Sequence, residues 1–391
     1  MKGSPIIGVT PAVLKWARES ANMSIFDVAD TLKKSVDTIQ AWESGESAPT
    51  YSQLEKLAYD VYKRPLALFF MPAAPDEPKP SAEFRSLPDA DLMHLSRQTT
   101  LLIRKARAFQ MALVELYGER NPVVAPIWKR IQLNSRADIA QEAIRIRDAL
   151  GVSMADIAET PNDDSALKIW RRAIEAQGIH VFKDSFKQKE LSGFCLRHPE
   201  FPVILINNST TRTRQIFSLL HELAHLLCDR SGISRFDDQG IEELPRPDRD
   251  IEKFCNALAA EILVPSEYFN LASRGFDPLH AEDEDFAQLA DRFYVSRSVI
   301  LRRFVDRGLV SIAFYLDKDR EWTEQIRATR DAGGGSYYNT RGTYLSEQFL
   351  REVVTRYSRR LISKVEASDL IGEKPRNFDR FEDIVLRGYA V

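Results

Sequence analysis

The stretch from Arg212 to Leu227, RTRQIFSLLHELAHLL, decides how this chain is organised. Apolar residues recur at helical spacing on both sides of the group His-Glu-Leu-Ala-His, which predicts a mostly buried helix from Thr211 to Cys228. His221 and His225 are four residues apart, so both imidazoles leave the same face of that helix. Two neutral imidazoles at this spacing can bind one zinc ion (Zn²⁺) at about 2.0–2.1 Å. The stretch therefore predicts a metal site on a rigid helical support.

Glu222 follows the first of these histidines and lies to one side of the two ligands. A carboxylate in that place can take a proton from water, which is the task of a general base in peptide hydrolysis. With six histidines in the chain, an accidental H-E-x-x-H is expected on the order of once per hundred such sequences. Two imidazoles and a carboxylate on an otherwise apolar helix would be costly to bury without a metal. The motif thus predicts a zinc-dependent metallopeptidase.

A catalytic zinc usually has three protein ligands, so a third ligand is needed. The next long helix is predicted from about Asp250 to Leu263, and Glu252 precedes its apolar stripe. We expect Glu252 to complete a His-His-Glu site. Glu261 lies about 180° round the same helix and is predicted to be a solvated surface side chain. The residue types leave other carboxylates and one thiol open as rival ligands, namely Glu242, Glu243, Asp248, Asp250 and Cys255.

The fold predicted around these two helices is multidomain and mainly α-helical, with a small β-sheet. Residues 178–207 contain three apolar stretches that predict short strands, GIHVFKD, SGFCLRH and PVILIN. Residues 229–249 are predicted to form a polar loop, residues 285–308 a pair of helices, and the chain from 311 onward further helices. Helix patterns also fill most of 92–176. The predicted domains are 1–72, 73–134, 135–310 and 311–391, where 73–134 combines a proline-rich linker with a helical region.

Composition excludes several classes of protein. The net charge of -3 argues against a polyanion binder that works by overall charge. The three cysteines, Cys195, Cys228 and Cys255, offer neither a disulfide framework nor a C-x-x-C metal pattern, and we expect free thiols. The first residues lack the apolar segment of a signal peptide, and no apolar run is long enough for a membrane span. We therefore expect a cytoplasmic protein without membrane contact.

Taken together, these segments resemble the ImmA/IrrE family of metallopeptidases. The resembling segments occur in order over about residues 135–310: ALKIWRRAIEAQGIHVF, LSGFCLRH, PVILINN, RTRQIFSLLHELAHLL, IEKFCNALAAEILVP and LADRFYVSRSVILRRF. The resemblance implies that His221, His225 and Glu252 bind zinc and that Glu222 is the general base. It departs at Phe254, where many relatives have a carboxylate. It also implies a zincin-like α+β peptidase domain that cuts an XRE-type repressor and so induces stress, phage or mobile-element genes.

The segment SIFDVADTLKKSVDTIQAWESGESAPTYSQLEKLA resembles the XRE type of helix-turn-helix. Residues 11–72 predict five short helices, with Ser24, Ser35 and Thr50 at the start of three of them. On the helix that would enter a DNA groove, Ser35, Thr38 and Gln40 could contact phosphates or bases. Residues 1–72 carry eight basic and eight acidic side chains, a net charge of zero. Both operator binding and protein docking therefore stay open for this module.

Three functions remain in competition: a site-specific regulatory endopeptidase, a DNA-binding regulator whose peptidase fold is a sensor, and a toxin-antitoxin or phage-defence component. For the first, the substrate is a protein, which we expect to extend along a strand such as 191–198, with Gly193 allowing close approach. A donor for the oxyanion is left open among Tyr268, His280, Tyr337 and Tyr338.

His94, His180 and His198 are expected at the surface or at domain boundaries. Gly333–Tyr338 is expected to be a linker rather than a lid, and 296–303 to pack on the peptidase rather than read DNA. The sequence leaves the oligomeric state open.

Overall fold

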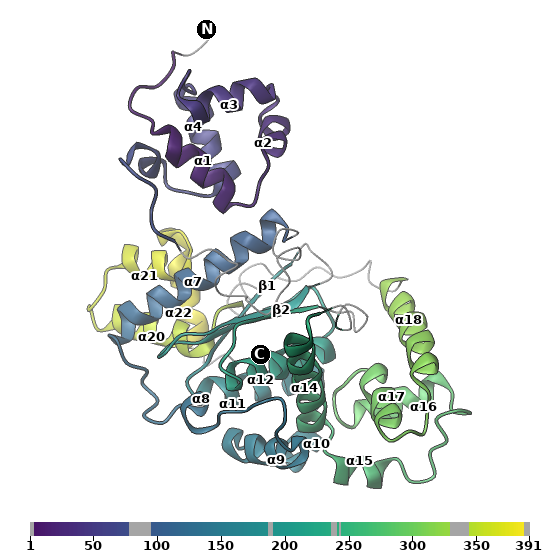
Figure 1. Ribbon diagram of the computed structural model, residues 1–391. Helices are drawn as coiled ribbons and strands as arrows, with labels where there is room; N and C mark the ends of the chain where they lie inside the picture. Colours follow the sequence, from purple (N-terminus) through teal and green to yellow (C-terminus); the bar gives the residue numbers. More distant parts are fainter. Residues whose placement is uncertain are drawn as a thin grey trace. The chain divides into compact units, whose positions relative to one another are not determined.

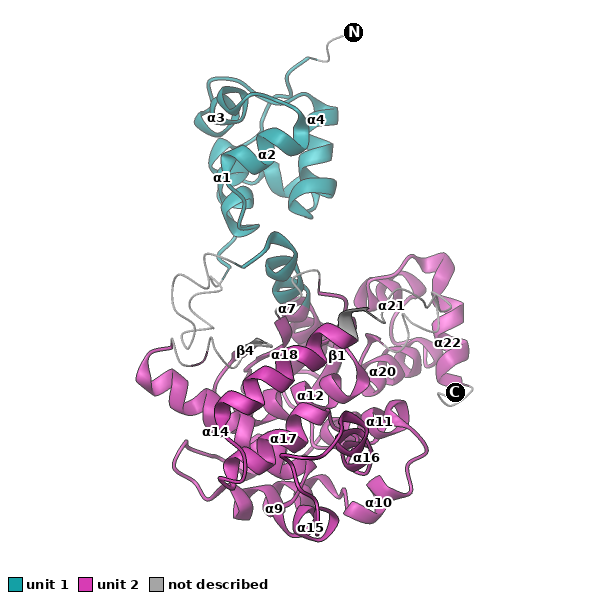
Figure 2. Cartoon of the chain, turned by 90° about the vertical axis from the view of Figure 1, so that its right-hand side faces the viewer, with its two compact units in different colours: residues 1–105 teal, residues 106–391 magenta. Residues whose placement is uncertain are grey.

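The structure is a computed structural model that describes residues 4–77, 95–186, 191–235, 241, 244–328 and 344–386. The chain divides into two compact units, residues 1–105 and 106–391 (Figures 1 and 2). The division lies inside helix α7 (Arg97–Tyr117). The finer domain boundaries at 72, 134 and 310 stay predictions. No helix within the described ranges is long and apolar enough to cross a membrane.

The first unit is a small helical domain around its own core. Its helices are α1 (Pro11–Ser20), α2 (Ile25–Leu32), α3 (Val36–Ser44), α4 (Tyr51–Lys56), the π-helical η1 (Leu57–Tyr62) that continues α4, and the 3₁₀ turn η2 (Leu66–Phe70). Because η1 prolongs α4, these segments confirm the five predicted helices. The hydroxyls of Ser24 and Ser35 accept from backbone N–H groups and begin α2 and α3. Trp42 and Leu54 are among its buried core residues.

The second unit joins many helices to one small sheet. Before the first strand in the chain come α8 (Ile127–Arg130), α9 (Ile139–Leu150), α10 (Met154–Ala158) and α11 (Asp163–Ala176), and α12 (Arg212–Leu227) comes between the third and fourth strands. Those that follow are α14 (Arg246–Leu263), α15 (Ser266–Ala272), α16 (Asp283–Asp291), α17 (Arg297–Asp306), α18 (Ile312–Ala328), α20 (Glu347–Ser358), α21 (Lys364–Ile371), η3 (Pro375–Asn377) and α22 (Phe378–Leu386). This mainly helical composition with a small sheet confirms the predicted fold class.

The sheet has four strands in the order β1-β3-β2-β4. The strands are β1 (His180–Asp184), β2 (Leu191–Leu196), β3 (Val203–Asn207) and β4 (Gly232–Arg235). β3 pairs parallel with β1 and antiparallel with β2, and β2 pairs antiparallel with β4. Two predictions were wrong here. The stretch 229–249 is not a loop throughout, because it contains β4 and the first turn of α14. β2 also lies between two strands, so it offers no free edge to a substrate peptide.

Helices cover both faces of this sheet. α12 packs against β2, β3 and β4, while α11 packs against both β1 and α12 (Figure 1). On the other face, Phe109 of α7 stacks on Phe182 with ring centroids 4.0 Å apart, and Phe349 of α20 meets both rings edge-on. Large rings on one face and a helix on the other hold the sheet in place beneath α12.

The start of α20 docks on the rest of the second unit through polar contacts. Arg172 lies 2.8 Å from Glu347, and Nδ1 of His180 lies 3.1 Å from the hydroxyl of Ser346. The prediction that His180 is a surface or boundary residue was wrong, because its side chain is fully buried. His198 is half-buried, and His94 lies outside the described residues. The start of α20 thus packs beside β1 and α11.

Candidate metal centre

Helix α12 presents the two histidines from the inside of the molecule. The hydroxyl of Thr211 accepts from the N–H of Arg214 and begins the helix, and the chain continues helically to Leu227, close to the predicted bounds. Leu219, Leu220 and Leu223 are fully buried. His221 and His225 are only 3% and 0% exposed, so the imidazoles are removed from solvent on a rigid support.

Helix α14 brings Glu252 to them and is fixed near both ends. Near its start, the Arg230 guanidinium lies 3.0 Å from Asp248, which links α14 to the chain that leaves α12. Near its end, the buried Arg147 donates to the carbonyl of Ile262 at 2.6 Å. α14 begins at Arg246, four residues before the predicted start.

Glu261 corrects a prediction, because it is buried rather than solvated. Its carboxylate accepts from the N–H and the hydroxyl of Ser266 at 2.7 and 2.9 Å and also pairs with Arg303. The helical spacing correctly predicted that Glu261 lies on the side of α14 opposite Glu252. It could not reveal that α15 and α17 supply partners on that other side.

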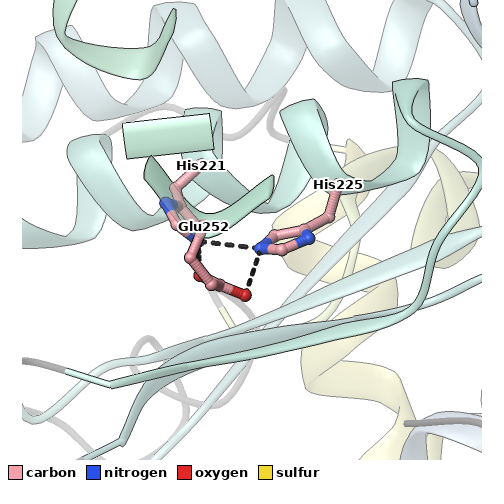
Figure 3. A group of neighbouring side chains, drawn as sticks. All are labelled: His221, His225 and Glu252. Carbon is pink, nitrogen blue, oxygen red and sulfur yellow. Dashed lines mark hydrogen bonds and ion pairs between the residues drawn. The ribbon is translucent and has the colours of Figure 1, made fainter. Parts of the chain in front are cut away.

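The side chains of His221, His225 and Glu252 converge on one point (Figure 3). The Nε2 atoms of the two histidines are 2.9 Å apart. Oε2 of Glu252 lies 3.3 Å from Nε2 of His221, and Oε1 lies 3.2 Å from Nε2 of His225. Ligands at about 2.05 Å from a tetrahedral zinc are about 3.3 Å from one another. The spacing and the donor set therefore fit a divalent metal ion with an open fourth position.

The electrostatics of the cluster also favour a cation. Burial alone would lower the pKa of His225, but the carboxylates of Glu252 and Glu222 raise it to about 9. Burial would raise the pKa of Glu252, but His225 and His221 outweigh it and hold that pKa well below its usual range. Nδ1 of both histidines has no hydrogen-bond partner in the described part of the chain. In the absence of an ion the carboxylate thus attracts a proton to the imidazoles, and a metal would take that proton's place.

Glu222 is completely buried beside this group, against strand β2. A Cβ atom added to Gly193 would lie 3.6 Å from its Oε1, and the thiol of Cys195 hydrogen-bonds with its carboxylate. Gly193 was predicted to allow close approach of a substrate backbone, but what lies close to it is Glu222 and the carbonyl of Leu205. The strand therefore forms the floor under the carboxylate.

The rival ligands lie elsewhere or are engaged. Asp248 pairs with Arg230, and Cys255 hydrogen-bonds with Cys228. Within the described residues, His221, His225 and Glu252 are the only group with the geometry of a metal site. Glu242 and Glu243 fall outside the described ranges, as do Tyr337, Tyr338 and the segment 333–335. Among the oxyanion candidates, Tyr268 is half-exposed and His280 hydrogen-bonds with Asp277.

The predicted DNA contacts lie on α3 and at its start. Ser35 and Gln40 are exposed, Thr38 is half-buried, and the two hydroxyls of Ser35 and Thr38 lie 2.8 Å apart. Their contact with DNA stays a prediction.

The helix pair α16–α17 packs into the core of the second unit, as predicted, instead of presenting a reading helix. Its arginines are engaged within the protein: Arg297 pairs with Asp283, Arg302 with Asp306, and Arg303 with Glu261.

Comparison with known proteins agrees with this geometry. Residues 174–305 match the family model described as an IrrE N-terminal-like domain, and residues 14–58 match a helix-turn-helix model. The radiation response metalloprotease IrrE of Deinococcus radiodurans is 33% identical over 138 residues, which are 34% of this chain and 40% of that protein. Its counterpart from Deinococcus deserti is 36% identical over 111 residues, 28% of this chain and 38% of that protein. The chain thus spans about two fifths of the length of these curated relatives.

The family matches fall on the two parts of the chain where the resemblances were found. The IrrE-like match contains α12, α14 and the whole sheet, and hence His221, Glu222, His225 and Glu252. The helix-turn-helix match contains α2 and α3. Both resemblances are confirmed, and the chain joins a helix-turn-helix domain to a domain of the IrrE N-terminal-like family.

Proposed function

We propose that this chain is a zinc-dependent endopeptidase of regulatory type, which cleaves an XRE-type transcriptional repressor. The observation that carries the proposal is the convergence of His221, His225 and Glu252 from two helices, with Glu222 buried beside them. The similarity to proteins named radiation response metalloproteases supports the same activity. The helix-turn-helix domain in the same chain supports a substrate or a target in transcriptional regulation.

The residues divide the work of hydrolysis between them. His221, His225 and Glu252 would hold a zinc ion, which when bound acidifies water and polarises a carbonyl group. The carboxylate of Glu222 accepts a proton from the attacking water and then delivers it to the leaving amine.

The strand available to a substrate backbone is β4 rather than β2. β4 is an edge strand among the described residues, and its first residue, Gly232, lies against His225. A peptide added antiparallel to β4 would make backbone hydrogen bonds and pass beside the ligands. This placement replaces the one predicted along residues 191–198.

The test is cleavage of defined proteins by the full chain. XRE-type repressors from the same genome, above all those encoded beside this gene, are incubated with the zinc-loaded protein and their fragments identified by mass spectrometry. A single cut that stops on addition of a chelator is the expected result. No cut in any repressor, by a chain that binds zinc, would contradict the proposed substrate.

A second function is favoured by a separate observation, the intact helix-turn-helix core. The chain would then bind an operator and use the IrrE-like domain to sense metal. Sequence-specific DNA binding that changes with zinc, without cleavage, would support this second function.

A further inference from the structure

The face of the sheet below α12 contains unusually small residues where it meets the metal cluster. Cys195 of β2 and Gly232 of β4 are opposite one another in the antiparallel register. A Cβ atom built on Gly232 would lie 2.8 Å from Cγ of His225, 2.9 Å from Cδ2 and 3.0 Å from Nδ1. Real Cβ contacts are not that short, so no side chain fits here while the imidazole keeps its place. The φ angle of Gly232 is not positive, so backbone conformation does not explain this glycine.

The ring of His225 depends on packing for its orientation, because the hydrogen bond that usually orients a metal-binding histidine is missing among the described residues. Histidines that bind metals generally donate their other N–H to a carbonyl or carboxylate, which fixes the orientation of the ring. Nδ1 of His225 has no hydrogen-bond partner among the described residues. On the Nδ1 side of the ring, the close approach of Gly232 therefore takes over part of the orienting role.

Gly232 is itself held by the buried thiol of Cys195. The N–H of Gly232 donates to Sγ of Cys195 at 3.3 Å, and the thiol also lies against the carboxylate of Glu222. Cys195 is completely buried in the strand that forms the floor under Glu222. The thiol of Cys195 thus contacts both the backbone of Gly232, which lies against His225, and the carboxylate of Glu222.

We propose that Gly232, held by the thiol of Cys195, is a positioning residue that fixes the imidazole of His225 for the metal ion. The inference rests on the metal centre of the proposed function and adds the residues that orient one of its ligands. It does not depend on which peptide is cut, or on whether any peptide is cut.

The direct test is Gly232→Ala in the full chain, measured by zinc affinity against a chromogenic chelator and by the visible spectrum after cobalt replaces zinc. We expect zinc affinity to fall by roughly 10- to 100-fold, the range for loss of an outer contact to a ligand, and the cobalt bands to shift. Gly193→Ala is the matched control, because it adds the same methyl group to the neighbouring strand, below Glu222 rather than below His225. We expect its zinc affinity to stay close to the parent's, because the added methyl group does not meet a ligand. Circular dichroism of both variants monitors the fold.

Cys195→Ala and Cys195→Ser provide a second measurement should Gly232→Ala not fold. We expect the alanine variant to lose zinc affinity, and the serine variant, which retains a hydrogen-bonding side chain, to recover part of it. Parent-like zinc affinity and cobalt bands in folded Gly232→Ala would overturn the inference, as would a parent chain that takes up neither metal. Altered metal binding without any detectable proteolysis would support the positioning role and contradict only the proposed peptidase function.

Discussion

Nε2 of His225 lies 3.2 Å from Oε1 of Glu252, although the two residues belong to different helices, α12 and α14. The third ligand is therefore provided by tertiary packing, whereas the two histidines are provided by helical spacing. Ion pairs and hydrogen bonds near both ends of α14 hold the carboxylate in this place. The metal would in turn connect the two helices.

Glu252→Ala should abolish most of the zinc binding. The change removes one of three ligands and leaves two imidazoles, so we expect affinity to fall by roughly 100-fold or more. Elemental mass spectrometry of the purified, untagged protein should give about one zinc per parent chain and little in the variant. Glu267→Ala, at an exposed glutamate on α15, is the control and should keep the metal. Equal zinc contents in all three proteins would rule Glu252 out as a ligand.

Glu222→Gln should separate metal binding from catalysis. Glutamine has nearly the shape of glutamate but cannot accept the proton, and general base catalysis contributes about 10²–10⁴-fold to rates. We expect unchanged zinc content and a loss of cleavage of this size, measured on the repressor identified above. Cleavage at the parent rate would show that Glu222 is not the base.

The sequence predicted best what is determined locally. α12 was predicted to within one residue of each end, because its signals are local: Thr211 caps its start, and the apolar stripe and the histidine spacing lie within it. β4 was missed, because Gly232–Arg235 lies in a stretch of polar residues, glycines and prolines, and it becomes a strand through pairing with β2.

The contacts that shape the site could not be predicted from the sequence either. Gly232 was predicted only as part of the polar loop 229–249, and nothing in the sequence indicated that His225 would lie against it. Glu261 was assigned to the surface because its partner Arg303 comes 42 residues later, on another helix. His180 was assigned similarly, since Ser346 is 166 residues away.

Breaking the pair of Glu261 and Arg303 should destabilise the second unit. Both side chains are about nine-tenths buried, so Glu261→Ala leaves a buried guanidinium without its charge partner, at a cost of about 3–5 kcal/mol. Asp306→Ala on the same helix α17 breaks a half-exposed pair with Arg302 and should cost at most about 1 kcal/mol. Urea unfolding of zinc-free protein measures both changes. Equal losses would contradict the structural role given to Glu261.

His180 should make the protein less stable in mild acid. Burial lowers its pKa to about 3, whereas the unfolded chain takes up this proton near pH 6.5. The unfolded state therefore binds more protons between these values, and stability that is present above pH 6.5 is lost as the pH falls. At pH 5 the loss from this residue is about 2 kcal/mol relative to pH 7.5. His180→Phe should remove that part of the loss in urea unfolding at the two pH values. A variant with the parent's pH dependence would contradict this account.

The first unit gives the last prediction, which concerns DNA. Asp37 is exposed on α3, where it would face the phosphates of an operator, while Gln40 is exposed on the same helix and suited to a base edge. Asp37→Asn should therefore strengthen binding to many sequences, with a steeper dependence on salt. Gln40→Ala should weaken binding to the preferred sequence alone, by about 1–3 kcal/mol. Fluorescence anisotropy of the full chain on DNA selected from a random library measures both effects. If no sequence is enriched and Asp37→Asn binds no better, α3 does not read DNA, and the helix-turn-helix domain is left to dock a protein partner.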